Sequence, residues 1–235
     1  KAKESKNFEE AKKHATASVK VTTEIINESK ELLNAMGIPI IQAPSEGEAQ
    51  AAIMARKGIV YAAASSDFDT LLFGTPRLIR NLNITGKRKI PGTSIYREVK
   101  PEIIYLDKTL STLNLTKEQL ITLGILVGTD YNPGGIPGIG PKKALAHIQK
   151  YKTFDKIFDN VSWDFDINPK EIHDFFLNPP TTNTCNITPI EANPSKIEEI
   201  LCGKHEFSKE RVDSMLKKLD QLKNQKKQTT LGNWS

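Results

Sequence analysis

Residues 59–69 read IVYAAASSDFD, an apolar run that is followed at once by two aspartates. The run predicts a short buried strand over residues 59–64. Asp67 and Asp69 then stand just beyond the carboxyl end of that strand, which is where ligand sites gather in α/β sheets. The stretch therefore predicts one strand of an α/β fold, with acidic residues at its ligand-binding edge.

The neighbouring segments extend this pattern in both directions. Further strands are expected at residues 38–41, 77–82 and 103–106, with hairpin-turn chemistry in ITGKRKIPG (84–92) between the last two. Caps, capping boxes and first-turn prolines mark several helices, and helices are expected over the second half of 1–36 and over 45–57, 116–127, 141–151, 154–158, 169–176, 195–201 and 208–222. We predict an α/β fold with a mixed, mainly parallel sheet flanked by helices, followed by a helical C-terminal part.

The composition sets broad limits on function. The 235 residues carry a formal net charge of +5, and the sequence pI is near 9.0. This balance favours an acidic partner such as nucleic acid, although many basic proteins bind none. No apolar run approaches the roughly 20 residues of a membrane helix, so no membrane association is expected. The two cysteines, Cys185 and Cys202, are expected to be free thiols in a reducing compartment.

Five carboxylates occupy the ends of expected elements. Glu46 and Glu48 lie in APSEGEAQ at a strand-to-helix junction, Asp67 and Asp69 follow the strand, and Asp130 follows the apolar run LGILVG. Like charges gathered at one edge repel one another unless a cation neutralises them. Mg²⁺ prefers carboxylate oxygens, and two such ions about 4 Å apart activate water and stabilise the leaving oxygen of a phosphodiester.

Each acid also has a structural interpretation, which spacing alone leaves open. Glu48 stands three residues after Ser45, and together they form a capping-box pattern. Asp67 and Asp69 are suited to cap a following turn, and Asp130 to serve as an ordinary loop acid.

The segment GGIPGIGPKK at residues 134–143 carries a second signal. Gly138 and Gly140 allow a tight turn with positive φ, and Pro141 opens a helix directly after it. Backbone N–H groups at that helix start, with Lys142 and Lys143 beside them, are suited to grip a DNA backbone without reading bases. This is the pattern of a helix-hairpin-helix, and the alternative is a plain glycine-rich connection between two helices.

Three ordered blocks, QAPSEGEAQAA, AASSDFDTLLFG and LVGTDYNPGGIPGIGPKKAL, resemble the internal nuclease region of flap endonucleases, the archaeal branch above all. The resemblance runs from about residue 25 to the C-terminus. It implies a PIN-like fold with a helix–two-turn–helix, and a Mg²⁺-dependent 5′ nuclease of DNA replication and repair that cleaves branched DNA near the junction of single strand and duplex.

The resemblance also assigns roles to residues. Metal-binding and catalytic roles fall on Glu46, Glu48, Asp67, Asp69 and Asp130, with Asp130 acting mainly on a second ion, and duplex binding falls on Gly138, Gly140, Lys142 and Lys143. In relatives the same loop holds a K⁺ ion through backbone oxygens, for which Gly135, Ile136 and Ile139 are the counterparts here. The lysines between positions 12 and 20 correspond to the base of an arch over the 5′ strand, or to a solvated helix face.

The tail QTTLGNWS resembles the box with which these enzymes bind the sliding clamp PCNA. Gln228, Leu231 and Trp234 match it, whereas Ser235 stands where a second aromatic is usual. The alternative is a polar tail with no partner. We expect three parts: a nuclease core with the start of the arch at 1–132, a helical DNA-binding part at 133–222, and a flexible tail at 223–235.

The front of the family pattern is not recognisable in this sequence. In the family that region carries two further metal-binding aspartates, a catalytic lysine and a catalytic arginine. A non-catalytic module that binds branched DNA and the clamp is therefore the main alternative, and a small-molecule phosphatase is a weaker one. The expected location is the cytoplasm for an archaeal source and the nucleus for a eukaryotic one.

Overall fold

The structure, a computed structural model, describes residues 21–82, 86–89, 93 and 95–229. The chain divides into two compact units: one is formed by residues 42–185, and the other by the segments up to residue 41 and from residue 186 onward. The expected boundary at residue 132 therefore does not coincide with a boundary between compact units. As a division between functional parts it stays a prediction.

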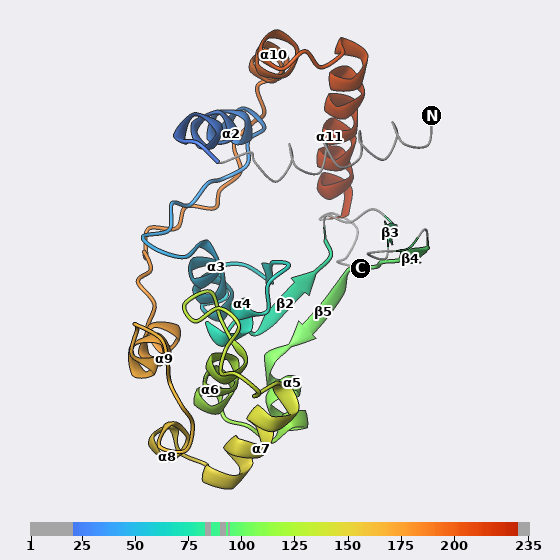
Figure 1. Ribbon diagram of the computed structural model, residues 1–235. Coiled ribbons are helices and arrows are strands. Elements are labelled where there is room, and N and C mark those ends of the chain that lie inside the picture. Colours follow the sequence, from blue (N-terminus) through green and yellow to red (C-terminus); the bar gives the residue numbers. More distant parts are fainter. Residues whose placement is uncertain (1–20, 83–85, 90–92, 94, 230–235) are drawn as a thin grey trace, which may run out of the picture. The chain divides into compact units, whose positions relative to one another are not determined.

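The larger unit is built on a small mixed sheet (Figure 1). Its strands β1 (Ala63–Ala64), β2 (Arg77–Arg80) and β5 (Glu102–Tyr105) lie in the order β1-β2-β5. The β1–β2 pairing is parallel and the β2–β5 pairing is antiparallel. In chain order between β2 and β5, the strands β3 (Lys87–Lys89) and β4 (Tyr96–Glu98) form a separate antiparallel pair. The mixed sheet is confirmed, but the strands described here are not mainly parallel.

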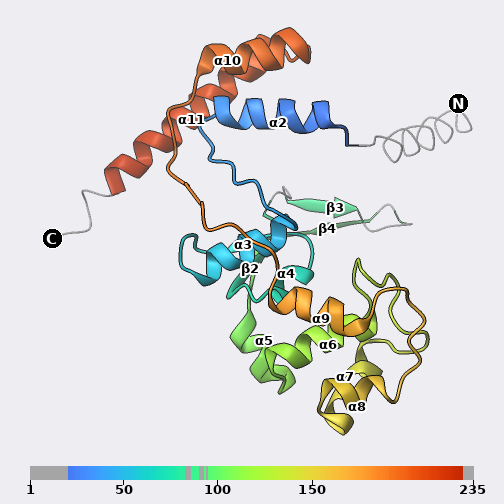
Figure 2. The same ribbon diagram turned by 90° about the vertical axis from the view of Figure 1, so that its left-hand side faces the viewer.

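The larger unit also contains the helices α3 (Gly47–Arg56), α4 (Asp69–Leu72), α5 (Leu106–Leu113), α6 (Lys117–Val127), α7 (Pro141–Tyr151), α8 (Phe154–Phe158) and α9 (Pro169–Leu177). Of these, α3 packs on β1, α5 packs on β5, and α4, α7 and α9 pack on α6; Figure 2 shows α9 running beside α6. The expected capping box is present at α6, where Thr116 and Gln119 satisfy each other's backbone N–H groups. Helix α5 was not predicted; it starts at Leu106, which the sequence placed at the end of a strand.

Helix α6 is the centre of the main core. Ile121, Ile125 and Leu126 on α6 are fully buried, against Ala49 and Ala52 of α3 and further apolar residues of α4, α7, α8 and α9. Burying an aliphatic side chain of this size stabilises a fold by about 1.5–3 kcal/mol. Because the expected nuclease segments and the expected DNA-binding segments share this core, they fold as one unit.

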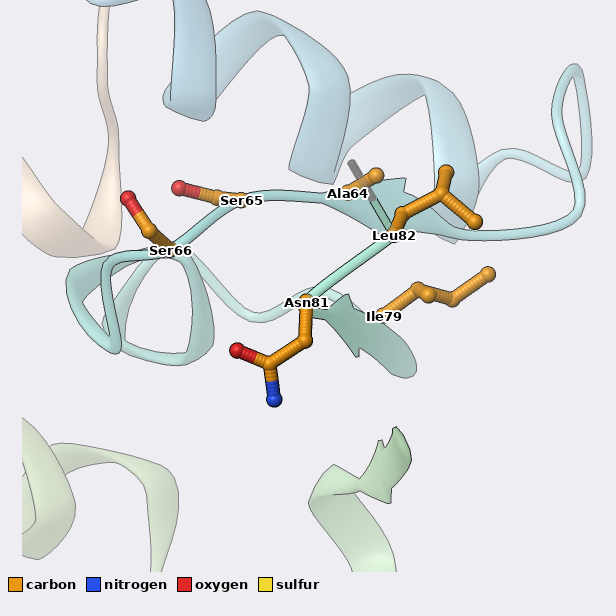
Figure 3. A pocket seen from close by; sticks show the side chains of 6 residues that line it. All are labelled: Ala64, Ser65, Ser66, Ile79, Asn81 and Leu82. Atoms are coloured by element: carbon orange, nitrogen blue, oxygen red, sulfur yellow. The ribbon is translucent and has the colours of Figure 1, made fainter. Parts of the chain in front are cut away.

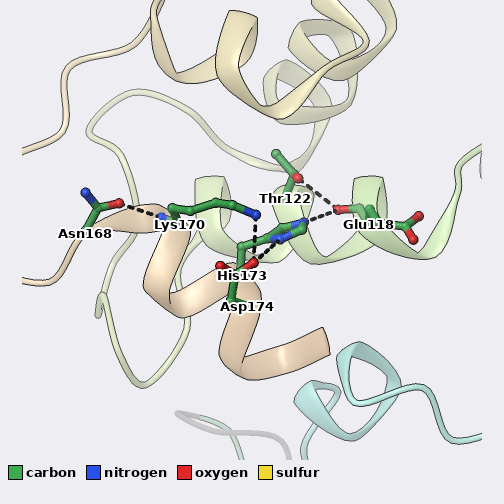
Figure 4. A network of polar contacts seen from close by, with 6 residues as sticks. All are labelled: Glu118, Thr122, Asn168, Lys170, His173 and Asp174. Atoms are coloured by element: carbon green, nitrogen blue, oxygen red, sulfur yellow. Dashed lines mark hydrogen bonds and ion pairs between the residues drawn. The ribbon is translucent and has the colours of Figure 1, made fainter. Parts of the chain in front are cut away.

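A polar network fastens α9 to α6 (Figure 4). The ring of His173 is buried, contacts the backbone oxygen of Glu118 at 3.3 Å, and lies 4.9 Å from the ring of Phe154. Burial lowers the pKa of His173, so the ring packs between the helices in its neutral form at neutral pH. The network holds α9, which also carries Phe175 and Phe176, against α6.

The smaller unit is helical. It contains α2 (Thr23–Ala35), α10 (Pro194–Glu198), the π-helix η1 (Glu199–Lys204) and α11 (Lys209–Thr229). Its core joins Ala35, Ile197, Ile200 and Val212. The expected helix at 195–201 thus corresponds to α10 and η1, with η1 continuing to Lys204.

Two expectations in this unit were wrong. Residues 38–41 form no strand; Ile38 donates its N–H back to the Leu33 carbonyl at 2.9 Å, which completes the C-terminal cap of α2. Helix α11 ends at Thr229, later than the expected 222, because nothing in its polar sequence breaks a helix. The lysines between positions 12 and 20, and Leu231 and Trp234, lie outside the described residues.

No helix in the described ranges is long and apolar enough to cross a membrane.

Candidate active site

The turn after β1 is organised by hydrogen bonds between its own polar groups. The Asp67 backbone N–H donates to Ser65 Oγ at 2.9 Å, and the Asp69 N–H donates to Asp67 Oδ1 at 3.0 Å. Thr70 Oγ1 donates to the Asp67 carbonyl at 3.2 Å. Phe68 is the N-cap residue of α4 and makes no side-chain cap bond. The Asp67 carboxylate accepts the N–H of Asp69, the first residue of α4, and this contact fixes where Asp69 begins the helix.

The glutamates enter from the start of α3, although not through the expected cap. Glu46, not Ser45, is the N-cap residue of α3, and no side chain there accepts a capping bond. The predicted capping box between Ser45 and Glu48 is therefore wrong. The Glu48 carboxylate instead accepts a hydrogen bond from Ser65 Oγ. The structural alternative for Glu48 is thereby removed, and Glu48 faces the turn after β1.

Buried contacts anchor α3 in this position. Ala49 and Ala52 are fully buried, and Gln50 is 3% exposed. The Gln50 side chain accepts from the Thr182 N–H at 2.8 Å and donates to the Thr182 carbonyl at 3.0 Å. This paired contact satisfies a buried amide and holds the start of α3 against residues that are distant in sequence.

Asp130 arrives from the C-terminal end of α6, next to a tyrosine that the sequence did not single out. Tyr131 Oη donates to Glu46 Oε1 at 2.7 Å. Its ring packs 5.0 Å from Phe175 and 5.9 Å from Phe176, while Phe73 at the end of α4 lies 4.8 Å from Phe176. An aromatic cluster thus supports both the segment of Asp69 and the segment of Asp130.

The five acids lie close enough for their charges to shift the pKa of Asp69. Burial, followed by the charges of Asp67, Asp130, Glu48 and Glu46, raises the pKa of Asp69 to about 7. Burial also raises the pKa of Glu48, an effect that Ser65 opposes and the other carboxylates reinforce. Burial and the hydrogen bond to Glu46 raise the pKa of Tyr131, so that its hydroxyl stays a donor. Three segments therefore deliver their acids to one place.

The donor set fits a hard divalent cation, but the site is open. Within the described ranges, no three Asp, Glu, His or Cys side chains already surround a position for a metal ion. The acids are near enough to shift one another's pKa values, yet they do not form a closed cage. Carboxylates that repel one another suit a hard cation that neutralises them and keeps some of its water ligands, as Mg²⁺ does.

A pocket of about 290 Å³ lies beside this cluster, at the ends of β1 and β2 (Figure 3). Ser65 and Ser66 line it where the chain leaves β1, and Asn81 and Leu82 line it where the chain leaves β2. On β2, the Arg80 guanidinium lies 3.9 Å from the centroid of the half-exposed Phe68 ring and donates to the Ser66 carbonyl at 3.1 Å. The turn that carries Asp67 and Asp69 is thus also tied to β2.

The glycine-rich hairpin, residues 134–140, begins four residues after Asp130. Gly128, Gly134, Gly135 and Gly138 have positive φ, as a chain that turns twice within a few residues requires. Gly140 does not: its φ is −86°, and it is the N-cap residue of α7. The expectation of positive φ was right for Gly138 and wrong for Gly140.

One backbone hydrogen bond and the buried side chain of Asn132 hold the hairpin closed. The Ile136 N–H donates to the Leu126 carbonyl at 3.0 Å. Fully buried Asn132 donates to the Ile125 carbonyl at 2.7 Å and accepts from Thr129 Oγ1 at 2.8 Å. These bonds replace the helical partners that the end of α6 would otherwise lack. The hairpin is therefore a continuation of α6, not a loose connection.

The two lysines at the start of α7 differ in their surroundings. Both are exposed, and Lys143 Nζ donates to the Gly138 carbonyl at 2.9 Å. Pro141 occupies the first turn of α7, as predicted. The hairpin thus presents backbone and positive charge together on a surface.

This fold is the PIN-like nuclease fold. A solved structure of flap endonuclease-1 from Methanococcus jannaschii aligns with 94% of this chain and 65% of its own, with a TM-score of 0.76 and 36% identity. The catalytic core of Rad2, solved in complex with a DNA substrate, shares the fold at 21% identity and a TM-score of 0.69, over 91% of this chain and 73% of that one. Residues 37–130 match the family described as XPG I-region.

The chain belongs to the flap endonuclease family. It is 52% identical, over 233 residues, to flap endonuclease 1 from Pyrococcus furiosus. The alignment covers 99% of this chain and 68% of that protein. Across eight flap endonucleases from archaea, the chain spans between 60% and 68% of the relative's length. The family recognised from three sequence blocks is thus confirmed, and the roles of individual residues stay predictions.

Proposed function

We propose that this chain is the catalytic and DNA-binding portion of a structure-specific 5′ flap endonuclease and 5′–3′ exonuclease of DNA replication and repair. It would hydrolyse phosphodiester bonds near junctions of single-stranded and duplex DNA. The observation that carries the proposal is the convergence of five carboxylates on one open site, where burial and the neighbouring carboxylate charges raise the pKa of Asp69 to about 7. A carboxylate cluster of this kind is costly without cations and is suited to hold them.

The residues of this chain would hold two Mg²⁺ ions and orient the substrate phosphate. Glu46, Glu48, Asp67 and Asp69 are the proposed ligands, directly or through water, and Asp130 would serve mainly the second ion. When bound, the ions would supply Lewis-acid stabilisation of charge on the attacking and leaving oxygens of an in-line displacement. Tyr131 keeps Glu46 in place, and the bond from the Asp69 N–H to the Asp67 carboxylate fixes Asp69.

The hairpin would hold the duplex by its backbone. Gly138 and Gly140 let the chain approach phosphates closely, and Lys142 and Lys143 supply charge. Contacts of this type carry no sequence information, which suits an enzyme that selects substrates by shape. Because Asp130 and the hairpin both follow α6 within a few residues, the same helix end would serve cutting and holding.

Two further family features belong to the proposal. Carbonyl oxygens of Gly135, Ile136 and Ile139 would hold a K⁺ ion in the hairpin. Gln228, Leu231 and Trp234 would bind the sliding clamp PCNA, with Trp234 as the aromatic anchor, the residue type that carries much of the energy of such interfaces. Fluorescence anisotropy of this chain with the clamp, compared with a Leu231→Ala/Trp234→Ala variant, tests the second point; equal binding by both would refute it.

The deciding experiment is Mg²⁺-dependent cleavage of an end-labelled 5′-flap duplex by this chain. Cleavage at the junction, absent with EDTA and slow on an unbranched duplex, is the expected result. DNA binding without cleavage would instead favour a module that recognises branched DNA and does not cut it. A small-molecule phosphatase would neither bind nor cleave the flap duplex.

A further inference from the structure

We propose that Ser65, a residue with no assigned role, is a positioning residue that sets the place of Glu48 relative to Asp67 and thereby the affinity of the site for divalent metal ions. The inference rests on the proposed function, since it concerns the same carboxylate site. It predicts that one neutral hydroxyl, which binds no metal itself, controls metal uptake.

Ser65 connects three elements that carry or position the acids. Its backbone N–H donates to the Ile79 carbonyl at 3.2 Å, which extends the parallel pairing of β1 with β2 by one residue. Its Oγ donates to Glu48 on α3 and accepts from the Asp67 N–H at 2.9 Å. Ser65 therefore fixes the position of Glu48 relative to both the sheet and the turn after β1.

The direction of these bonds is fixed by chemistry. A serine hydroxyl has one proton to donate and two lone pairs to accept with. Because the Asp67 N–H can only donate, it takes one of the lone pairs, and the hydroxyl proton remains available for the Glu48 carboxylate. Bonds arranged head to tail in this way polarise one another, which strengthens the contact with the charged form of Glu48.

The cluster has few other groups that could do this. No described lysine or arginine forms an ion pair with any of the five acids. The side-chain donors that reach its carboxylates within the described chain are two hydroxyls, Ser65 at Glu48 and Tyr131 at Glu46. A neutral donor holds a carboxylate in place without cancelling the negative charge that attracts cations to the site.

The chain offers a matched control at the next position. Ser66 is exposed, lines the same pocket as Ser65 (Figure 3), and contacts Arg80 through its backbone carbonyl. Replacing its side chain removes a hydroxyl of the same type, from the same turn, without touching an acid. Any effect of Ser65→Ala that Ser66→Ala lacks therefore belongs to the contact with Glu48 and Asp67.

The test is calorimetric titration of the chain with Mg²⁺ alone and with Mn²⁺ alone, without DNA. Ser65→Ala should weaken metal binding by about 10- to 100-fold, the usual cost of losing a group that orients a ligand. Ser65→Thr keeps the hydroxyl and should stay within about threefold of the unsubstituted chain. Ser66→Ala should bind the metal ions as tightly as the unsubstituted chain does. Thermal melts of each variant separate weakened metal binding from loss of the fold.

Several outcomes would overturn the inference. Metal affinity that is equal in Ser65→Ala and the unsubstituted chain would do so, as would an equal loss in Ser66→Ala, or no metal uptake by the unsubstituted chain. If Ser65→Ala does not fold, Ser65→Cys, which retains the shape with a weaker donor, should weaken binding while Ser65→Thr does not. Because uptake is measured without DNA, failure of every variant to cleave would count against the proposed function alone.

Discussion

The carboxylate cluster, to which the C-terminal end of α6 contributes Asp130, and the glycine-rich hairpin, which follows the same helix end, are stabilised in opposite ways. In the cluster, burial and neighbouring charges raise the pKa values of Asp69 and Glu48. In the hairpin, Asn132 and the Ile136 N–H satisfy the carbonyls at the end of α6, and no charge is buried. One region carries electrostatic strain and the other carries backbone constraint.

The contrast separates what the fold needs from what the proposed chemistry needs. Removing an acid from the cluster should relieve repulsion, so the cost should fall on activity and not on stability. Removing a glycine from the hairpin should disturb packing around α6, so the cost should fall on stability. Substitutions in the two regions therefore test whether the division holds.

The largest effect is expected for Asp69→Asn. This change keeps the shape but removes the charge at the centre of the cluster, and it should lower the rate of flap cleavage by about a thousandfold, or roughly 4 kcal/mol in the barrier. DNA affinity, measured by anisotropy, should change by less than about twofold, because the hairpin is untouched. Cleavage at the original rate would exclude the role given to Asp69.

The next effect is on stability and lies in the hairpin. A Cβ at Gly135 would stand 2.2 Å from the Val127 carbonyl oxygen, at a φ of +62°, so Gly135→Ala should cost about 3 kcal/mol in denaturant unfolding. Gly138→Ala meets open space at positive φ and should cost about 1 kcal/mol. Gly140→Ala, with open space and negative φ, should cost less than about 0.5 kcal/mol. Equal costs at the three glycines would contradict this account.

A smaller effect is expected from pH. The pKa of Asp69 rises from 3.8 to about 7 on folding, so the folded state binds the proton more tightly than the unfolded state. The stability that this proton confers is complete below about pH 4 and is lost as the pH rises through about 7. Thermal melts in EDTA should show this decline, and Asp69→Asn should reduce it. Mg²⁺ at pH 8 should restore stability to the unsubstituted chain more than to the variant.

The smallest effects are expected at the lysines of the hairpin. Lys142→Ala and Lys143→Ala should each reduce the slope of log K against log salt by about 1, and weaken binding alike on flaps of different sequence. Lys143→Ala should also lower stability slightly, since Lys143 bonds to the Gly138 carbonyl, whereas Lys142→Ala should not. Unchanged salt slopes would argue against DNA binding by the hairpin.

Local signals predicted most of the helices, although α4 and α5 were not among those expected. The capping box at Thr116, the first-turn prolines of α7 and α9, and the positive φ of Gly138 all follow from chemistry within a few residues. The strands were harder, since β1 is only two residues long and its apolar run extends beyond the pairing. Residues 38–41 are as apolar as a strand but have no partner, which only tertiary structure decides.

The acids of the site were identifiable from sequence, but the residues that arrange them were not. Glu46, Glu48, Asp67, Asp69 and Asp130 stand out because charged residues flank apolar runs. Ser65 and Tyr131 carry no such signal: a serine in a turn and a tyrosine after a helix are ordinary, and their partners lie 17 and 85 residues away. Position along the chain cannot reveal contacts of that separation.

In the proposed function, the hydrogen bond from Tyr131 to Glu46 connects the cutting site to the hairpin that holds the duplex. Tyr131 lies between the last acid of the cluster and the hairpin, and it packs on the aromatic residues of α9. The place where duplex would be held and the place where it would be cut are then two points on one rigid frame. Such a frame acts as a caliper: the number of nucleotides between grip and incision would be set by the length of the protein's own framework, whatever bases the DNA carries.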